Sequence, residues 1–174
     1  MKTYRVAIIG LGRMGSTIDE EHPALGPYSI PACCRTSDRL ELVAGSDLIQ
    51  ERREAFGKKW DISALYEDYL EMIEKERLDV VSVATQPEHR AEIVVYAAEH
   101  GVKAIYAEKA LAASLEQADA MVDAIERNGV AFNMGTNRRW DPGYDTMKAV
   151  IDSGELGALR SLIIHDTGTL FNGA

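Results

Sequence analysis

Apolar and polar residues follow two patterns along this chain, short continuous apolar runs and longer stretches with helical spacing. Val6–Ile9 is apolar throughout, as expected of a strand covered on both faces. Glu67–Arg77 instead places Leu70 and Ile73 on one side of a helix. The same patterns predict further strands at Leu40–Ala44, Asp79–Ala84, Val102–Ala107, Val130–Met134 and Leu159–Thr169. They predict further helices at Ile49–Lys59, Pro87–Glu99, Leu115–Asn128 and from Pro142 to Gly154.

Local signals mark the ends of two of these helices. Pro87 suits a first helical turn, where its missing N–H costs nothing. Ser114 and Gln117 have the spacing of a capping box. The helix that follows is expected to turn one apolar face inward, made of Leu115, Ala118, Val122 and Ile125.

Strands that alternate with helices predict a doubly wound α/β fold, with a parallel sheet between two layers of helices. One stretch, Asp19–Asp38, is irregular and rich in proline. It is interpreted either as an elongated surface connection or as a flap beside a ligand, because long loops in compact domains are often functional.

A G-x-G-x-x-G loop follows the first strand and opens a predicted helix. Gly10 permits a tight turn, Gly12 lets a pyrophosphate approach the backbone, and Gly15 lets the helix pack closely on the strand. Arg13 and Met14 complete the loop. Backbone N–H groups at such a helix start favour phosphate. The loop therefore predicts dinucleotide binding.

Ligands of open α/β sheets bind outside the carboxyl ends of the strands, so the residues at those ends are the site candidates. Asp47 follows the second strand, where a carboxylate binds both ribose hydroxyls and repels a 2′-phosphate, favouring NAD over NADP. The spacing between the glycine loop and Asp47 is longer than the usual ~20 residues. The alternative interpretation of Asp47 is an aspartate that only stabilises a turn. Arg52 and Arg53 weaken the predicted preference for NAD over NADP, since either could reach a 2′-phosphate.

Two more segments are expected at the carboxyl ends of the strands. Thr85, Gln86, Pro87 and His89 follow one buried strand, and Glu108 and Lys109 follow the next. Lys109 can hydrogen-bond a substrate oxygen and share its proton during hydride transfer; a surface ion pair with Glu108 is the alternative. For His89 the alternative is a capping or packing role.

Composition narrows the class of partner. The chain has 174 residues and a net charge of −9, without an evident basic patch, which argues against nucleic acid or an anionic membrane surface. No stretch approaches the ~20 apolar residues of a membrane span, and Met1 is followed directly by a strand rather than a signal peptide. Cys33 and Cys34 are adjacent and read as reduced residues of a cytoplasmic protein. The histidines show no metal-ligand spacing, so no metal is expected.

Taken together, the motifs resemble the glucose-fructose oxidoreductase and inositol dehydrogenase family of NAD(P)-dependent sugar and cyclitol oxidoreductases. The resemblance covers nearly the whole chain and rests on Gly10–Gly15, Ala44–Asp47, Thr85–His89, Glu108–Lys109, Asn137–Pro142 and Ile151–Gly157. It implies that the glycine loop binds the pyrophosphate, that Asp47 binds the adenosine ribose, and that the Thr85–His89 segment lines the cofactor. It places Glu108 and Lys109 at the nicotinamide and substrate.

The chain departs from the family pattern in two respects. Ala110 stands where the family usually has proline, which affects the local backbone more than the role of Lys109. The family also continues into a second α/β domain that binds substrate and usually forms oligomers. Residues 1–135 are therefore expected to be the Rossmann domain, and 136–174 a connecting helix and the first strand of an incomplete second domain.

The resulting hypothesis is a cytoplasmic oxidoreductase that transfers hydride between NAD and a secondary alcohol of a sugar, cyclitol or related polyol. The full-length form is expected to be a homo-oligomer, and this chain alone is expected to bind cofactor with little or no turnover. The alternative is a non-catalytic dinucleotide-binding module such as a redox sensor or partner subunit. A structural α/β domain without a ligand leaves the motifs at the strand ends unexplained.

Overall fold

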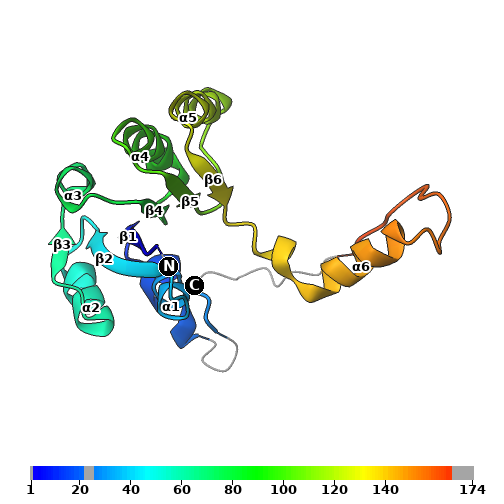
Figure 1. Ribbon diagram of the computed structural model, residues 1–174, viewed down its shortest axis with the longest axis horizontal. Helices are drawn as coiled ribbons and strands as arrows, with labels where there is room; N and C mark the ends of the chain where they lie inside the picture. The colour runs from blue at the N-terminus through cyan, green and yellow to red at the C-terminus, as the bar shows by residue number, and fades with distance from the viewer. Residues whose placement is uncertain (1, 22–25, 166–174) are drawn as a thin grey trace, which may run out of the picture. The chain divides into compact units, whose positions relative to one another are not determined.

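The computed structural model describes residues 2–21 and 26–165, with the backbone alone at 137–138. Within them a single parallel sheet has the strand order β3-β2-β1-β4-β5-β6 (Figure 1). Its strands are β1 (Tyr4–Ile9), β2 (Leu40–Ser46), β3 (Ala64–Tyr66), β4 (Val80–Val83), β5 (Ala104–Ala107) and β6 (Ala131–Met134). The strand order reverses between β1 and β4, and the doubly wound fold predicted from the sequence is confirmed.

Helices connect the strands and cover both faces of the sheet. The α-helices are α1 (Ile30–Arg35), α2 (Gln50–Trp60), α3 (Tyr69–Glu76), α4 (Pro87–Glu99), α5 (Leu115–Asn128) and α6 (Pro142–Asp152). Three short non-α helices are η1 (Arg13–Thr17), η2 (Ile18–Glu20) and η3 (Asn137–Trp140). In Figure 1, α3, α4 and α5 lie on one side of the sheet, and α1 and α2 lie on the other.

The apolar core has two parts, one on each face of the sheet. The larger part packs Val81 and Val83 of β4 against Met72 of α3, Val94 of α4 and Met121 of α5. The smaller part joins Ile8, Leu11, Phe56 and Trp60 beneath α1 and α2. Both faces of the central strands are therefore covered, which explains why their sequences are continuously apolar.

The segment after the glycine loop differs from the predicted helix. The chain forms the π-helical turn η1 and then the single 3-10 turn η2, in place of a regular α-helix. Asp19 then accepts hydrogen bonds from the backbone N–H groups of Tyr28 (2.7 Å) and Ser29 (3.2 Å). These bonds lead the chain into α1, which begins at the N-cap Ser29. The irregular stretch Asp19–Asp38 thus contains a helix that the sequence analysis did not predict.

Two further expectations about single elements were incomplete. The strand β3 was not predicted, because its three residues are too few to show periodicity. The expected inward face of α5 was wrong in part: Met121 and Ala124 are buried, whereas Leu115 is 83% exposed and Val122 is 44% exposed. Leu115 is the first residue of the helix, beyond the area that the sheet and α4 cover.

Residues after the sheet form a separate unit. By compactness the chain divides into Met1–Gly135 and Thr136–Ala174. The second unit contains η3 and α6, and α6 has no buried residue. The described part of the strand expected at Leu159–Thr169, residues 159–165, forms no strand, and residues 166–169 lie outside the described residues. A strand needs a pairing partner for its backbone groups, and these residues have none within the described chain.

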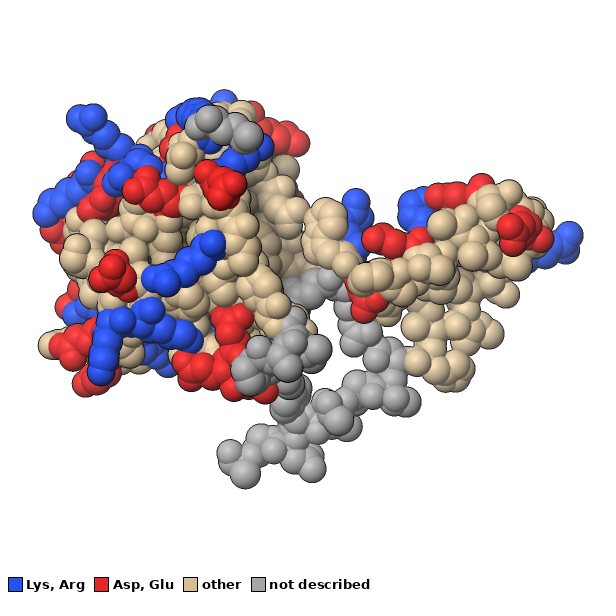
Figure 2. Space-filling view, turned by 60° about the horizontal axis from the view of Figure 1, so that its bottom comes forward, with Lys and Arg blue, Asp and Glu red and all other residues tan. Residues whose placement is uncertain are grey.

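The surface of the first unit carries charges of both signs. Figure 2 shows Lys and Arg side chains interspersed with Asp and Glu side chains on the visible face of this unit. Ion pairs within this unit include Arg13 with Glu21 at 2.6 Å and Lys59 with Glu20 at 2.7 Å. None of the helices in the described ranges is long and apolar enough to cross a membrane.

Candidate functional site

Backbone hydrogen bonds bring the predicted site segments together along one edge of the sheet. The Gly10 N–H donates to Ser46 O at 2.8 Å, which links the glycine loop to the end of β2. The Ala84 N–H donates to Ile9 O at 2.8 Å, and the Glu108 N–H donates to Val83 O at 2.9 Å. The carboxyl ends of β1, β2, β4 and β5 are therefore joined side by side.

The three glycines of the loop have different surroundings. Gly10 has φ +90°, and a Cβ there would lie 2.9 Å from the backbone carbonyl of Ala84. A Cβ on Gly15 would lie 1.9 Å from Gly10 O, so only glycine fits this contact. Among the described residues, a Cβ on Gly12 would meet only the guanidinium of Arg52, at 3.8 Å. The loop is thus closed by backbone at Gly10 and Gly15 and open above Gly12.

Asp47 connects the end of β2 to the glycine loop. Its Oδ2 accepts the Leu11 N–H at 2.8 Å, and its Oδ1 accepts the Ile49 N–H at 2.9 Å. The side chain is 7% exposed, and Arg52 Nη1 lies 3.6 Å from Oδ2. One N–H of the loop is therefore already satisfied by Asp47. Each carboxylate oxygen still has a second acceptor position for a ligand hydroxyl.

Of the arginines around the loop, two are held by bonds to other residues and one lies beside Gly12. Arg13 forms a two-bond ion pair with Glu21, through Nε at 2.6 Å and Nη2 at 2.7 Å, and this pair raises its pKa. Arg53 donates to Asp47 O at 2.6 Å. Met14 is half-buried. Arg52 is half-exposed beside Gly12, so it is the arginine nearest to the open part of the loop.

The loop after β4 presents one buried hydroxyl. Thr85 Oγ1 is buried and has no hydrogen-bond partner within the described chain. Gln86 is the N-cap of α4, and Pro87 occupies the first turn as predicted. The His89 side chain is 71% exposed, with Nδ1 3.7 Å from Glu92 Oε1. The structure thus places Thr85 at the sheet edge, whereas His89 lies on the exposed surface of α4.

The segment after β5 joins a buried acid to an exposed lysine. Glu108 is 7% exposed, and its Oε1 accepts a hydrogen bond from the Tyr106 hydroxyl at 3.4 Å. Burial and the charge of Glu108 raise the pKa of Tyr106 to about 12, so this hydroxyl stays protonated. Lys109 is exposed, and its peptide bond to Ala110 is cis. The ammonium is thus available to a ligand at this edge.

Comparison with known families agrees with this arrangement. The sequence profile of an oxidoreductase family with an NAD-binding Rossmann fold matches residues 4–136. This chain belongs to that family. The match ends just after β6, so it spans the sheet and every predicted site residue.

The chain is also similar, in sequence and in structure, to individual members of the family. The chain is 33% identical over 153 residues to scyllo-inositol 2-dehydrogenase (NAD(+)) of Bacillus subtilis, covering 88% of this chain and 41% of that protein. It is 40% identical over 124 residues to D-apiose dehydrogenase of Paraburkholderia graminis, covering 71% of this chain and 32% of that protein. The crystal structure of myo-inositol 2-dehydrogenase from Lactobacillus plantarum has a TM-score of 0.76, with 26% identity over 90% of this chain and 43% of that one. The chain spans less than half the length of these relatives.

The sheet edge fits the dinucleotide that the family binds. The space above Gly12 is free of other backbone atoms, as close approach of a pyrophosphate requires. The unpartnered Thr85 hydroxyl is a second polar group that a ligand can satisfy. No group of three or more His, Cys, Asp or Glu side chains that could hold a metal ion occurs among the described residues.

The sequence analysis did not identify Arg90, which contacts one of the site segments. Arg90 is 1% exposed and is the largest fully buried side chain among the described residues. Its Nη2 donates to Thr85 O. Sequence patterns place an arginine in the first helical turn on the surface, and the only available signal was its position directly after the Thr85–His89 segment.

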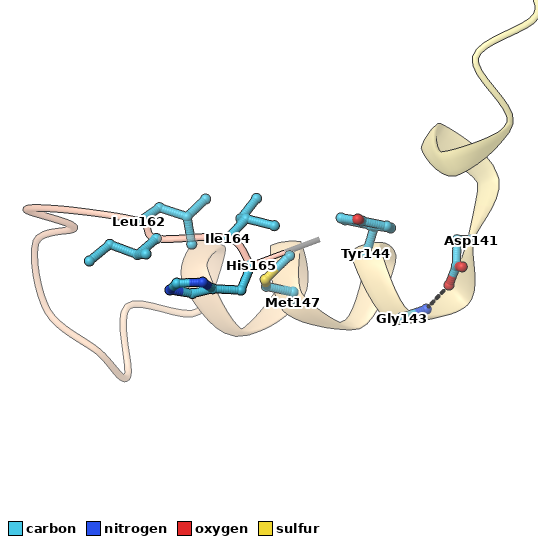
Figure 3. A pocket seen from close by; sticks show the side chains of 8 residues that line it. Asp141, Gly143, Tyr144, Met147, Leu162, Ile164 and His165 are labelled. Carbon is cyan, nitrogen blue, oxygen red and sulfur yellow. Dashed lines mark hydrogen bonds between the residues drawn. The ribbon is translucent and has the colours of Figure 1, made fainter. Parts of the chain in front are cut away.

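The second unit has a hollow of its own, of about 370 Å³ (Figure 3). Its walls are Asp141, Gly143, Tyr144, Met147, Leu162, Ile163, Ile164 and His165. Asp141 Oδ1 already accepts the Gly143 N–H at 2.7 Å, which caps α6. The hollow includes no predicted site residue and is lined by residues of α6 and by residues 162–165, so we do not assign it to the cofactor.

Proposed function

We propose that this chain is the cofactor-binding part of an NAD-dependent oxidoreductase that transfers hydride to or from a secondary alcohol of a sugar, cyclitol or related polyol. The observation that carries the proposal is the open space above Gly12, which lies at the sheet edge shared with Lys109. The names of the related inositol and apiose dehydrogenases support the substrate class. Residues 1–135 are then the Rossmann domain, and 136–174 the start of the substrate domain.

In this proposal each edge residue has a part in holding the dinucleotide. Backbone groups of Gly10, Gly12, Arg13, Met14 and Gly15 surround the pyrophosphate. Asp47 binds the hydroxyls of the adenosine ribose through its free acceptor positions. The segment with Thr85, Gln86, Pro87 and His89 lines the nicotinamide half together with Glu108.

Bound NAD would supply the hydride acceptor, and the residues of this chain orient the substrate. The Lys109 ammonium donates a hydrogen bond to the reacting oxygen of the alcohol, and the hydroxyl proton passes to a base in the remainder of a longer protein as the carbonyl forms. Glu108, the residue before Lys109, is anchored by the Tyr106 hydroxyl. Substrate contacts beyond Lys109 are assigned to the remainder of a longer protein, in which we expect a homo-oligomer.

The cysteines support a reducing, cytoplasmic location. Cys33 and Cys34 are both free. Burial raises the pKa of the Cys34 thiol to about 11, so it stays protonated and unreactive. Thiols of this kind are typical of proteins from reducing compartments.

Replacing Asp47 with serine tests the preference for NAD. The substitution removes the charge that repels a 2′-phosphate, so the ratio of NAD affinity to NADP affinity is expected to fall about tenfold. Calorimetric titration with each cofactor measures the ratio. Glu51→Ser, an exposed acid in the first turn of α2, is the matched control and should leave it unchanged. An unaltered ratio in Asp47→Ser would remove Asp47 from the ribose site.

Replacing Lys109 with alanine separates an enzyme from a non-catalytic sensor. A full-length protein carrying this sequence should lose about a hundredfold or more of its polyol-dependent NADH formation, while its affinity for NAD should stay within about twofold. A sensor requires the glycine loop and Asp47 but not this lysine. Equal activity of the wild type and the variant, or no polyol oxidation by either, would favour the sensor.

A further inference from the structure

Buried polar atoms without partners concentrate beside one strand end. Within the described chain such side-chain atoms belong to Asp19, Ser82, Thr85 and Arg90. Three of these four residues lie in β4 or within seven residues of its end, next to the point where the strand order reverses. Arg90 contributes two of the atoms, Nε and Nη1. A buried polar group without a partner is costly, so its retention calls for a specific reason.

Arg90 lies where both the helix dipole and burial disfavour a positive charge. It lies in the first turn of α4, where the helix dipole is positive and disfavours a cation. Loss of solvent lowers its pKa, whereas the negative charges of Glu108 and then Glu88 oppose that shift. Glu108 is itself buried, at 7% exposed. The guanidinium and the Glu108 carboxylate are thus two buried charges of opposite sign that compensate each other.

Arg90 holds one of the two segments proposed to face the nicotinamide. Its Nη2 holds Thr85 O, the carbonyl at the start of the loop after β4. The negative charge of Glu108, the residue before Lys109, opposes the lowering of the Arg90 pKa by burial, although no hydrogen bond or ion pair joins these two residues within the described chain. Glu108 is held in turn by its N–H bond to Val83 O and by the Tyr106 hydroxyl.

We infer that Arg90 is a positioning residue, which holds the carbonyl of Thr85 and so fixes the loop after β4 in place for the nicotinamide half of the cofactor. The inference rests on the proposed function. It assigns Arg90 no contact with the cofactor, because the side chain is 1% exposed. The pyrophosphate and adenosine contacts at Gly12 and Asp47 do not depend on it.

Comparing NAD with ADP-ribose, which lacks the nicotinamide, isolates this effect. Calorimetric titration of the purified chain should show that the wild type binds NAD more tightly than ADP-ribose. In Arg90→Met this preference should fall about tenfold, while the affinity for ADP-ribose should change less than about threefold. Arg90→Lys keeps the positive charge and a donor for Thr85 O, so it should retain part of the preference.

Two further variants control for folding. Arg90→Met leaves Glu108 as an uncompensated buried charge, so the double variant Arg90→Met/Glu108→Gln, with neither charge, is used if the single variant does not fold. It should fold and still lack the preference for NAD. Arg127→Met, which removes a surface arginine paired with Glu99 at 3.2 Å, should behave as the wild type.

The outcomes distinguish this inference from the proposed function. A preference retained in Arg90→Met or in the double variant overturns the role of Arg90. So does an equal loss of affinity for both ligands, since that is the sign of a general structural role. A wild type that binds ADP-ribose as tightly as NAD also overturns it, while leaving the dinucleotide site intact. A wild type that binds neither ligand refutes the proposed function itself.

Discussion

Gly15→Ala is expected to lower the free energy of unfolding by about 3 kcal/mol. The new Cβ would lie 1.9 Å from Gly10 O, a backbone atom at the end of the first strand. The Gly10 N–H is bonded to Ser46 O, and a Cβ on Gly10 itself would contact the Ala84 carbonyl, so the loop cannot move away freely. Chemical denaturation followed by circular dichroism measures the change.

Two other glycines provide controls for this substitution. Gly129 ends α5 with φ +64° and open space around it, so Gly129→Ala reports the cost of backbone conformation alone, about 1 kcal/mol. Gly12→Ala places the same methyl group in the same loop without a backbone contact. If Gly15→Ala were as stable as Gly12→Ala, the close packing of the loop described above would be wrong.

Gly12→Ala is expected to weaken NAD binding by at least about tenfold while changing the free energy of unfolding by less than about 0.5 kcal/mol. The φ of Gly12 is −78°, outside the left-handed region that favours glycine, and among the described residues the new Cβ would meet only the far end of Arg52 at 3.8 Å. The methyl group instead occupies the space through which a pyrophosphate reaches the backbone. Calorimetry measures the affinity, and denaturation measures the stability.

The two glycine substitutions therefore separate binding from folding within one loop. Gly15→Ala should act on stability, and Gly12→Ala should act on affinity. A Gly12→Ala variant that binds NAD as tightly as the wild type would place the cofactor's phosphates elsewhere.

Continuous apolar runs and end signals were sufficient to predict most of the fold. Val6–Ile9 and Pro87–Glu99 were predicted almost residue by residue, because each is set by local sequence: an unbroken apolar run in one and a helix-starting proline in the other. Features decided by tertiary contacts were not predicted. The turns after Gly15 depend on Asp19 capping a distant segment, and β3 gains its strand conformation only by pairing with β2.

The candidate site likewise combines features that local sequence predicts with features that only tertiary contacts determine. Glycine spacing and position after a strand were sufficient to predict the loop and the residues at the strand ends, and the structure joins these segments through backbone hydrogen bonds. Sequence spacing did not distinguish His89 from its neighbour Arg90, although one side chain is exposed and the other buried. Burial at a helix start depends on how α4 packs on the sheet, and the charge that opposes the effect of burial on the pKa of Arg90 belongs to Glu108, which follows β5.

Titration of NAD into the purified chain, followed by calorimetry, tests the central claim most directly. The account predicts saturable binding with one site per chain, competition by ADP-ribose, and weaker binding in Gly12→Ala than in the wild type. Absence of binding by NAD and by NADP to the folded chain would contradict it.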